Sequence, residues 1–218
     1  MKSSLAPLLA LALLATACQG TRKLADPVIE IRGPDDVELG VATDYGLVFL
    51  GRSARSGPIE VTAWFGDGPS VEQAVVEPLG GGLFTAEPQI RFPRVPLHFE
   101  TPEPGAKLIA VGRIGRERWE AEVTVQADAR VEGLLTTIPP EVVAYDHQTG
   151  VGLYVIDPQV PDQRRLVGLV SGRVELTDAN GAVVRYLTAF GPDQLWRLVA
   201  YRREYPKRRK FVYRDDIL

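Results

Sequence analysis

The stretch that decides the fold lies at residues 166–189 and reads LVGLVSGRVELTDANGAVVRYLTA. Two runs rich in Val, Leu and Thr, at 166–177 and 182–189, flank a polar segment that ends in Asn180 and Gly181. Both residues of an Asn-Gly pair tolerate positive φ, so such a pair between alternating apolar runs is a strong hairpin signal. This stretch therefore predicts two antiparallel strands joined by a tight turn.

The sequence on both sides of this hairpin predicts a small α+β domain over residues 130–218. Before it, apolar runs around the polar segment 146–150 predict another hairpin. After it, the apolar period changes to helical spacing, which predicts a helix over about 192–205 that Pro206 ends. Residues 210–214 then predict a final strand.

The first half of the chain shows more short apolar runs, separated by Gly, Pro and Asp. Among them, 107–113 and 119–125 predict a hairpin, and the strand spacing favours a β-sandwich over residues 28–127. This pattern resembles an immunoglobulin-like domain, although the Cys–Trp–Cys signature of that family is absent. The predicted fold class is therefore mainly β, with an N-terminal immunoglobulin-like β-sandwich followed by the smaller α+β domain and its one C-terminal helix.

The N-terminus has the features of an export signal. A positive charge precedes the apolar run 5–14, which is too short to span a membrane, and small residues follow. The segment Leu14-Ala15-Thr16-Ala17-Cys18 resembles the lipobox of bacterial lipoproteins. The resemblance implies that residues 1–17 are a signal peptide, that Cys18 carries the lipid, and that residues 18–27 are a tether.

Two alternatives remain at this cut position. Residues 15–17 also match an ordinary A-x-A cleavage site, which would release a soluble protein, or the cysteine simply belongs to the leader. Lipidation would place the protein in the cell envelope. Gln19 after the cysteine resembles outer-membrane sorting, with the protein facing the periplasm in a Gram-negative source; a Gram-positive source would place the anchor in the plasma membrane.

The composition describes an ordinary globular chain with an uneven distribution of charge. No cysteine follows Cys18, so the folded part has neither a disulfide nor a thiolate metal site. The formal net charge of −3 combines two opposite parts. Residues 196–218 hold eight basic and three acidic residues, giving +5, whereas residues 18–195 carry −9.

Catalytic and metal-binding motifs are not recognisable in the sequence. The two histidines, His98 and His147, have no ligand spacing between them, and a zinc site needs three or four converging ligands. No G-x-S-x-G, P-loop or G-x-G-x-x-G pattern is present. We therefore predict no catalytic residue, no metal and no cofactor.

The basic, aromatic C-terminal segment is the most distinctive part of the mature chain. Arg-rich patches suit phosphate and carboxylate, and the export signal argues against nucleic acid as the partner. The segment predicts an anionic-ligand or partner site formed by Arg202, Arg203, Tyr205, Lys207, Arg208, Arg209, Lys210 and Tyr213. Two alternatives are that this segment docks on the acidic body of its own chain, or that it is a packed helix followed by a solvated turn and an edge strand.

These observations favour a membrane-anchored envelope lipoprotein with a non-enzymatic scaffolding or assembly role. Its expected partners are the membrane, through the lipid, and an envelope protein or an anionic envelope polymer. The second hypothesis is a lipoprotein that binds an anionic glycan or lipid through the basic aromatic segment. The third and least favoured hypothesis is a hydrolase. Asp and Glu residues are numerous, but the sequence does not show which two of them would lie together at a catalytic site.

Overall fold

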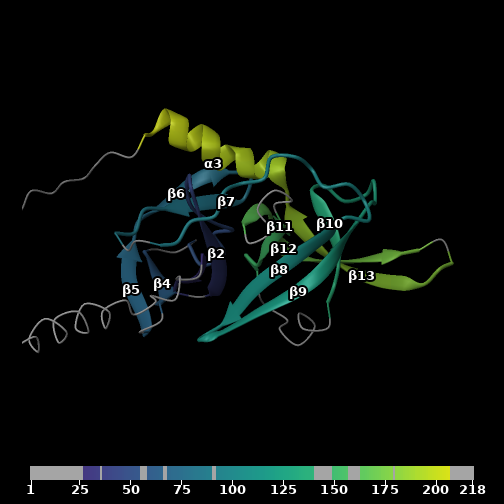
Figure 1. The fold of residues 1–218 in the computed structure, drawn as a ribbon, viewed down its shortest axis with the longest axis horizontal. Helices are drawn as coiled ribbons and strands as arrows, with labels where there is room; N and C mark the ends of the chain where they lie inside the picture. The colour runs from purple at the N-terminus through teal and green to yellow at the C-terminus, as the bar shows by residue number, and fades with distance from the viewer. Residues whose placement is uncertain are drawn as a thin grey trace, which may run out of the picture.

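The computed structural model of this protein describes residues 27–34, 36–54, 58–65, 68–89, 92–139, 149–156, 163–178 and 180–206. Within these residues the chain is mainly β with one C-terminal helix, as predicted. The strands form two sheets, each from a continuous part of the chain, and the helix lies across both (Figure 1).

The first sheet contains seven antiparallel strands in the order β5-β4-β1-β2-β3-β7-β6. The strands are β1 (Val28–Arg32), β2 (Val37–Thr43), β3 (Gly46–Phe49), β4 (Ile59–Phe65), β5 (Gly68–Ala74), β6 (Val76–Gly80) and β7 (Leu83–Ala86). Its two edge strands, β5 and β6, are separated in sequence only by the exposed Val75. The chain passes directly from one edge strand to the other, and the open sheet curls around an interior cluster of its own; we call this unit the first barrel.

The second sheet is a closed barrel of six antiparallel strands in the order β10-β13-β12-β11-β8-β9. The strands are β8 (Lys107–Ile114), β9 (Glu117–Gln126), β10 (Leu134–Thr137), β11 (Gly152–Ile156), β12 (Arg164–Thr177) and β13 (Val183–Phe190). The ring closes where β10 pairs with both β9 and β13. Closure removes the free edges of a sheet wherever the strands overlap.

The predicted immunoglobulin-like β-sandwich over residues 28–127 is wrong. The hairpin of β8 and β9 forms, but its strands pair with β11 and β10 and therefore belong to the second barrel. The two units meet between β7 and β8, not at residues 127–130 as predicted. Hydrophobic alternation shows which side chains face a core, but it does not show whether a sheet closes on itself or which distant strand it pairs with.

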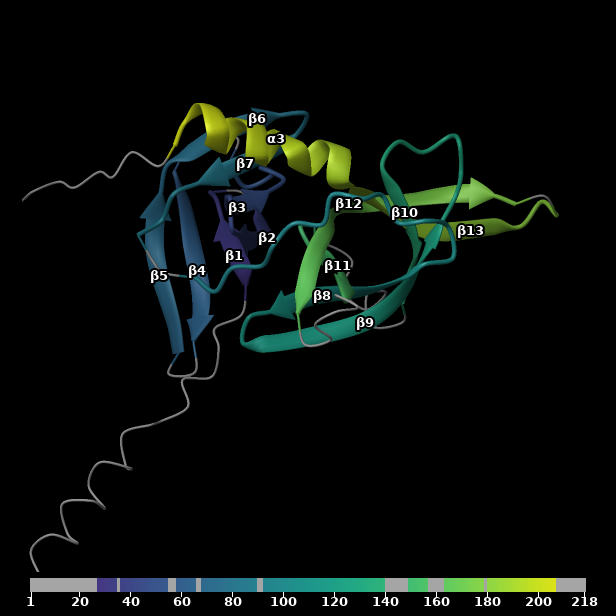
Figure 2. The same cartoon turned by 45° about the horizontal axis from the view of Figure 1, so that its top comes forward.

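The hairpin predicted around Asn180 and Gly181 is confirmed. β12 and β13 pair from Leu169 opposite Phe190 to Thr177 opposite Val183. The carboxylate of Asp178 accepts hydrogen bonds from the backbone N–H groups of Asn180 and Ala182, which stabilises the turn. This hairpin extends well beyond the barrel, as Figures 1 and 2 show.

Two cores lie on opposite faces of the strands β2 and β3. Ala42 and Phe49 point into the first barrel, where they join its interior cluster. Leu39, Val41 and Val48 point the other way and join a cluster that continues through the interior of the second barrel. Because successive side chains of a strand alternate between faces, one short apolar strand contributes to both cores.

The helix α3 (Pro192–Glu204) fastens the two barrels together. It begins after Gly191, whose N–H donates to the Gln194 side chain at 2.8 Å. Leu198 and Val199 are fully buried and join the core shared by both barrels. The helix contacts β3, β6 and β7 of the first barrel and β12 and β13 of the second (Figure 2).

Replacing Leu198 by Ala is expected to lower the free energy of unfolding by about 2–5 kcal/mol, because the lost side chain leaves a cavity in the shared core. Urea unfolding followed by tryptophan fluorescence measures the change. Arg197→Ala, at an exposed position of the same helical turn, is the control and should shift stability by less than about 0.5 kcal/mol. Equal effects of the two variants would contradict a bridging role for α3.

Candidate functional site

The two barrels are hydrogen-bonded to each other at the N-terminal end of β2. The ladder between β2 and β3 stops at Gly40 opposite Phe49, so the next backbone N–H toward the start of β2, that of Leu39, needs another acceptor. The backbone oxygen of Thr149, three residues before the start of β11, supplies it at 2.9 Å. We call the residues gathered here, namely Glu38, Leu39, Leu50, Ser53, Thr149 and Gly150, the interbarrel seam.

Gly150 allows the second barrel to approach this closely. A Cβ at Gly150 would lie 1.7 Å from the backbone oxygen of Leu39, and the φ angle of +86° is one that side chains rarely adopt. The N–H of Gly150 donates to the oxygen of Val170 on β12 at 2.8 Å. The turn Thr149-Gly150 is therefore held between β2 of the first barrel and β12 of the second.

A buried carboxylate lies on the first-barrel side of the seam. Glu38 is 1% exposed. One carboxylate oxygen accepts hydrogen bonds from Ser53, from N–H at 2.9 Å and from Oγ at 2.6 Å, and the other accepts from Leu50 N–H at 3.1 Å. Burial raises the pKa of the Glu38 carboxyl, the three hydrogen bonds lower it in part, and nearby Asp36 raises it further. Glu38 thus secures the turn after β3 to β2.

The hydroxyl of Thr149 is a polar group that the seam leaves unsatisfied. It is buried and has no hydrogen-bond partner among the described residues. A hydroxyl can donate a proton or, beside a base, act as a nucleophile, and an unsatisfied buried polar group is a signal of function. No described histidine hydrogen-bonds to this hydroxyl; the histidine nearest in sequence, His147, lies outside the described residues.

Of the predicted binding residues, Arg202 is committed to a contact within the chain. Its side chain is 13% exposed and pairs with Glu87 after β7, and its Nε donates to the backbone oxygen of Tyr45 at 2.8 Å. These contacts join the last turn of α3 to the first barrel. Arg202 therefore acts as a clamp between the helix and the acidic body, which leaves little of its side chain for a ligand.

The other described members of the predicted site lie on the exposed side of α3. Arg203 lies over the Trp196 ring at 5.5 Å, and Trp196 stacks on Phe99 at 4.8 Å. Tyr205 stacks on Tyr201, and its hydrogen bond with Glu204 raises the pKa of the phenol. Binding of an anionic ligand by these residues stays a prediction.

The remaining predicted residues lie outside the described part of the chain. They are Lys207, Arg208, Arg209, Lys210 and Tyr213, together with Cys18, the signal peptide 1–17 and the final strand at 210–214. In the part that is described, no helix is long and apolar enough to cross a membrane. No group of three or more His, Cys, Asp or Glu side chains that could hold a metal ion occurs among the described residues.

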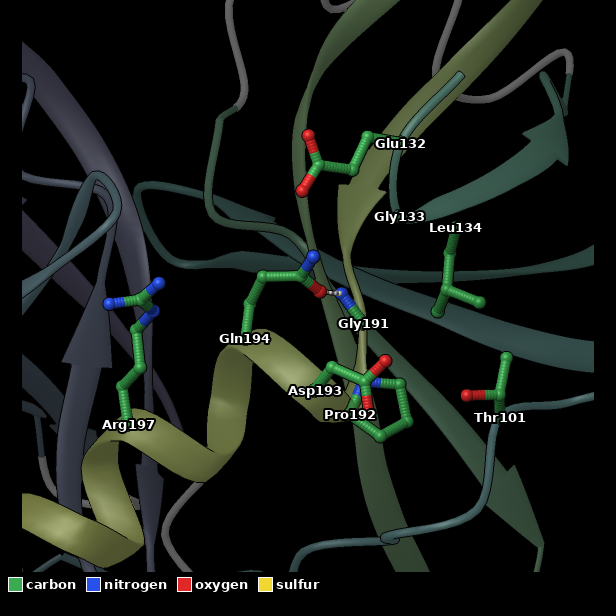
Figure 3. A pocket seen from close by; sticks show the side chains of 9 residues that line it. All are labelled: Thr101, Glu132, Gly133, Leu134, Gly191, Pro192, Asp193, Gln194 and Arg197. Atoms are coloured by element: carbon green, nitrogen blue, oxygen red, sulfur yellow. Dashed lines mark hydrogen bonds between the residues drawn. The ribbon is translucent and has the colours of Figure 1, made fainter. Parts of the chain in front are cut away.

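A cavity of about 380 Å³ lies at the start of α3, away from the seam (Figure 3). Its lining residues are Thr101, Glu132, Gly133, Leu134, Gly191, Pro192, Asp193, Gln194 and Arg197. The Gln194 side chain that faces it is already bonded to Gly191 N–H, as the dashed line in Figure 3 marks. None of the seam residues lines this cavity.

Comparison with known proteins identifies the fold. No protein-family model and no curated protein matches the sequence. Among solved structures, the MamO protease domain from Magnetospirillum magneticum is similar over 80% of this chain and 95% of its own, with 19% identity and a TM-score of 0.51. A serine protease of human pathogenic astrovirus matches 77% of this chain and 91% of its own, with 11% identity and a TM-score of 0.52.

The serine endoprotease from Yersinia pestis matches 82% of this chain and 63% of its own length, with 15% identity and a TM-score of 0.53. At these identities the likeness establishes the fold, which is the two-barrel fold of serine protease domains. It contradicts the predicted non-enzymatic scaffolding or assembly role, and with it the expectation that the chain is no enzyme, because all three neighbours are protease domains or proteases. The contradicted role depended on the absence of sequence motifs and on a sandwich that does not form.

No sequence pattern predicted a functional role for Glu38 or Thr149. Glu38 is a single acidic residue within the otherwise mostly apolar strand β2. This interruption is the only local signal in the sequence that a carboxylate is buried there. Thr149 follows His147 in a segment predicted to be a plain hairpin turn, and β11 pairs instead with β8 and β12. The junction is formed by residues more than a hundred positions apart.

Replacing Glu38 by Gln should change how stability depends on pH. Because the pKa of Glu38 is raised in the folded state, its contribution to stability is fully present below the ordinary value of 4.5 and is lost as pH rises through the folded pKa. Glu38→Gln lacks this loss, so its unfolding free energy relative to the unaltered protein should rise between pH 4.5 and 7.5. Urea titrations across that range measure it, with the exposed Glu117→Gln as control. A difference that does not vary with pH would contradict the assignment.

Replacing Gly150 by Ala should separate the two barrels locally. The new Cβ would meet the Leu39 oxygen and the backbone would hold a strained φ, together destabilising the fold by roughly 2–5 kcal/mol. Gly115→Ala is the matched control, since φ is also positive there but open space surrounds the site, and it should destabilise by about 1–2 kcal/mol. If thermal unfolding shows the same loss of stability in the Gly150→Ala and Gly115→Ala variants, the seam is not closely packed at Gly150.

Proposed function

We propose that this protein binds extended polypeptide segments along the edge of β12 that β11 leaves uncovered, with the Thr149 turn at the start of that edge. The observation that carries the proposal is the pairing of β12. Its partner on one side, β11, begins at Gly152 opposite Leu169 and so covers β12 no further than this residue, whereas β13 continues on the other side as far as Thr177. Among the described residues no strand covers the β11 side of β12 beyond Val170.

An open strand edge offers a row of backbone donors and acceptors, and an extended peptide adds to such an edge as one more strand. The edge begins beside the seam, because Val170 is hydrogen-bonded to Gly150 and Val151 in the Thr149 turn. A peptide added to β12 would therefore run past the Thr149 turn. The fold is that of protease domains, which supports polypeptide as the class of ligand.

Thr149 is the candidate nucleophile for cleavage of a peptide held on this edge, and because its hydroxyl is buried, the turn must move to expose it to the peptide. Its hydroxyl has no described partner, and the turn that carries it is held by hydrogen bonds to both barrels. Attack on a carbonyl would need a base to take the hydroxyl proton, and the described hydrogen bonds assign none. Binding and cleavage are therefore measured separately.

Adding the full-length protein to a library of fluorescein-labelled, extended decapeptides should raise the fluorescence anisotropy of the peptides that bind. In the protein, a bound peptide should slow hydrogen exchange of the backbone amides in residues 171–177. The turn at 115–116, which no peptide is expected to reach, is the internal control. Thr149→Val should change the affinity for the peptide by no more than about twofold, and it should lower the rate of any cleavage by roughly a hundredfold or more. Absence of binding, or protection confined to other strands, would overturn the proposal.

A further inference from the structure

The turn that follows β3, residues 50–54, is held rigidly against the seam. Glu38 accepts hydrogen bonds from Leu50 and Ser53, and the N–H of Ala54 donates to the oxygen of Gly51 at 3.3 Å. A Cβ at Gly51 would lie 2.0 Å from the Phe84 ring. The chain therefore has few other conformations here, and a side chain on this turn is presented from a fixed position.

A single exposed cation projects from this turn. Arg52 is exposed, whereas its neighbours Gly51 and Ser53 are buried. No described residue forms an ion pair or a hydrogen bond with Arg52. Many other arginines pair with carboxylates of the chain itself, namely Arg32 with Glu30, Arg118 and Arg164 with Glu120, Arg130 with Asp128, Arg185 with Glu175, and Arg202 with Glu87.

Arg52 and Thr149 lie on two turns that meet at the same end of β2. The turn of Arg52 is bonded to the side chain of Glu38, and the turn of Thr149 is bonded to the backbone of Leu39, the next residue. The free edge of β12 starts at the second of these turns. A guanidinium offers five donors in a planar fork that matches a carboxylate, so an anionic group on a peptide beside Thr149 would find its partner here.

We infer that Arg52 determines the specificity of this site and selects polypeptides that present a carboxylate next to the segment held at Thr149. The inference rests on the proposed peptide binding and adds the chemistry of the preferred ligand. An acidic side chain and a free C-terminus both supply a carboxylate.

Four labelled peptides of one length distinguish these sources. One has a central Asp with an amidated end, one has Asn in its place with an amidated end, one has Asn with a free C-terminus, and one has Lys with an amidated end. Anisotropy titrations of the full-length protein at low and high salt give the affinities. At least one carboxylate-bearing peptide should bind roughly tenfold more tightly than the amidated Asn peptide, and salt should reduce this preference.

Arg52→Gln should remove the preference without weakening the amidated Asn peptide, and Arg52→Glu should shift it to the Lys peptide. Arg116→Gln, an exposed arginine in the turn between β8 and β9, is the matched control and should leave all four affinities unchanged. Equal affinities for all four peptides, or a preference that survives Arg52→Gln, would overturn the inference and leave peptide binding standing. Failure of all four peptides to bind would overturn peptide binding itself, and with it the inference.

Discussion

The hydrogen bond from Leu39 N–H to the oxygen of Thr149 is the contact on which the arrangement of this protein depends. It is possible only because β3 turns away at Leu50 and leaves one backbone donor of β2 without a partner in its own barrel. An unpaired buried N–H is unfavourable by a few kcal/mol, so the second barrel is held where its Thr149 turn supplies the acceptor. Gly150 permits the approach because it has no side chain to block it.

The same end of β2 carries a buried carboxylate, and the two features reinforce each other. Glu38 would be strongly unfavourable in this position without the three hydrogen bonds from Leu50 and Ser53. Those bonds fix the turn after β3, which in turn leaves Leu39 free to pair with Thr149. The seam is thus a set of mutually dependent contacts, and α3 reinforces it with Leu198 in the shared core and the Arg202 clamp to Glu87.

The proposed binding of polypeptides depends on where one strand edge is left uncovered. Strand closure covers most of the edges of the second barrel, and among the described residues one uncovered edge is the β11 side of β12, just beyond Val170. It begins at the turn that holds the unpartnered Thr149 hydroxyl, and the turn of Arg52 is bonded to the adjacent residue of β2. The uncovered edge of β12, the Thr149 turn and the turn of Arg52 thus all adjoin the same end of β2.

Much of the local structure could be predicted from the sequence, because it depends on neighbours along the chain. Asn180-Gly181 specifies a hairpin turn, and the spacing of Leu195, Leu198 and Val199 specifies a helix that Pro206 ends. The mainly β class follows from the same periodicities. Closure of the sheets, the position of the boundary between β7 and β8 and the encounter of Glu38, Ser53 and Thr149 were decided only by tertiary structure. Alternation marks a buried face without naming the strand that pairs with it, and a buried polar group is recognisable only once its distant partners have been brought to it.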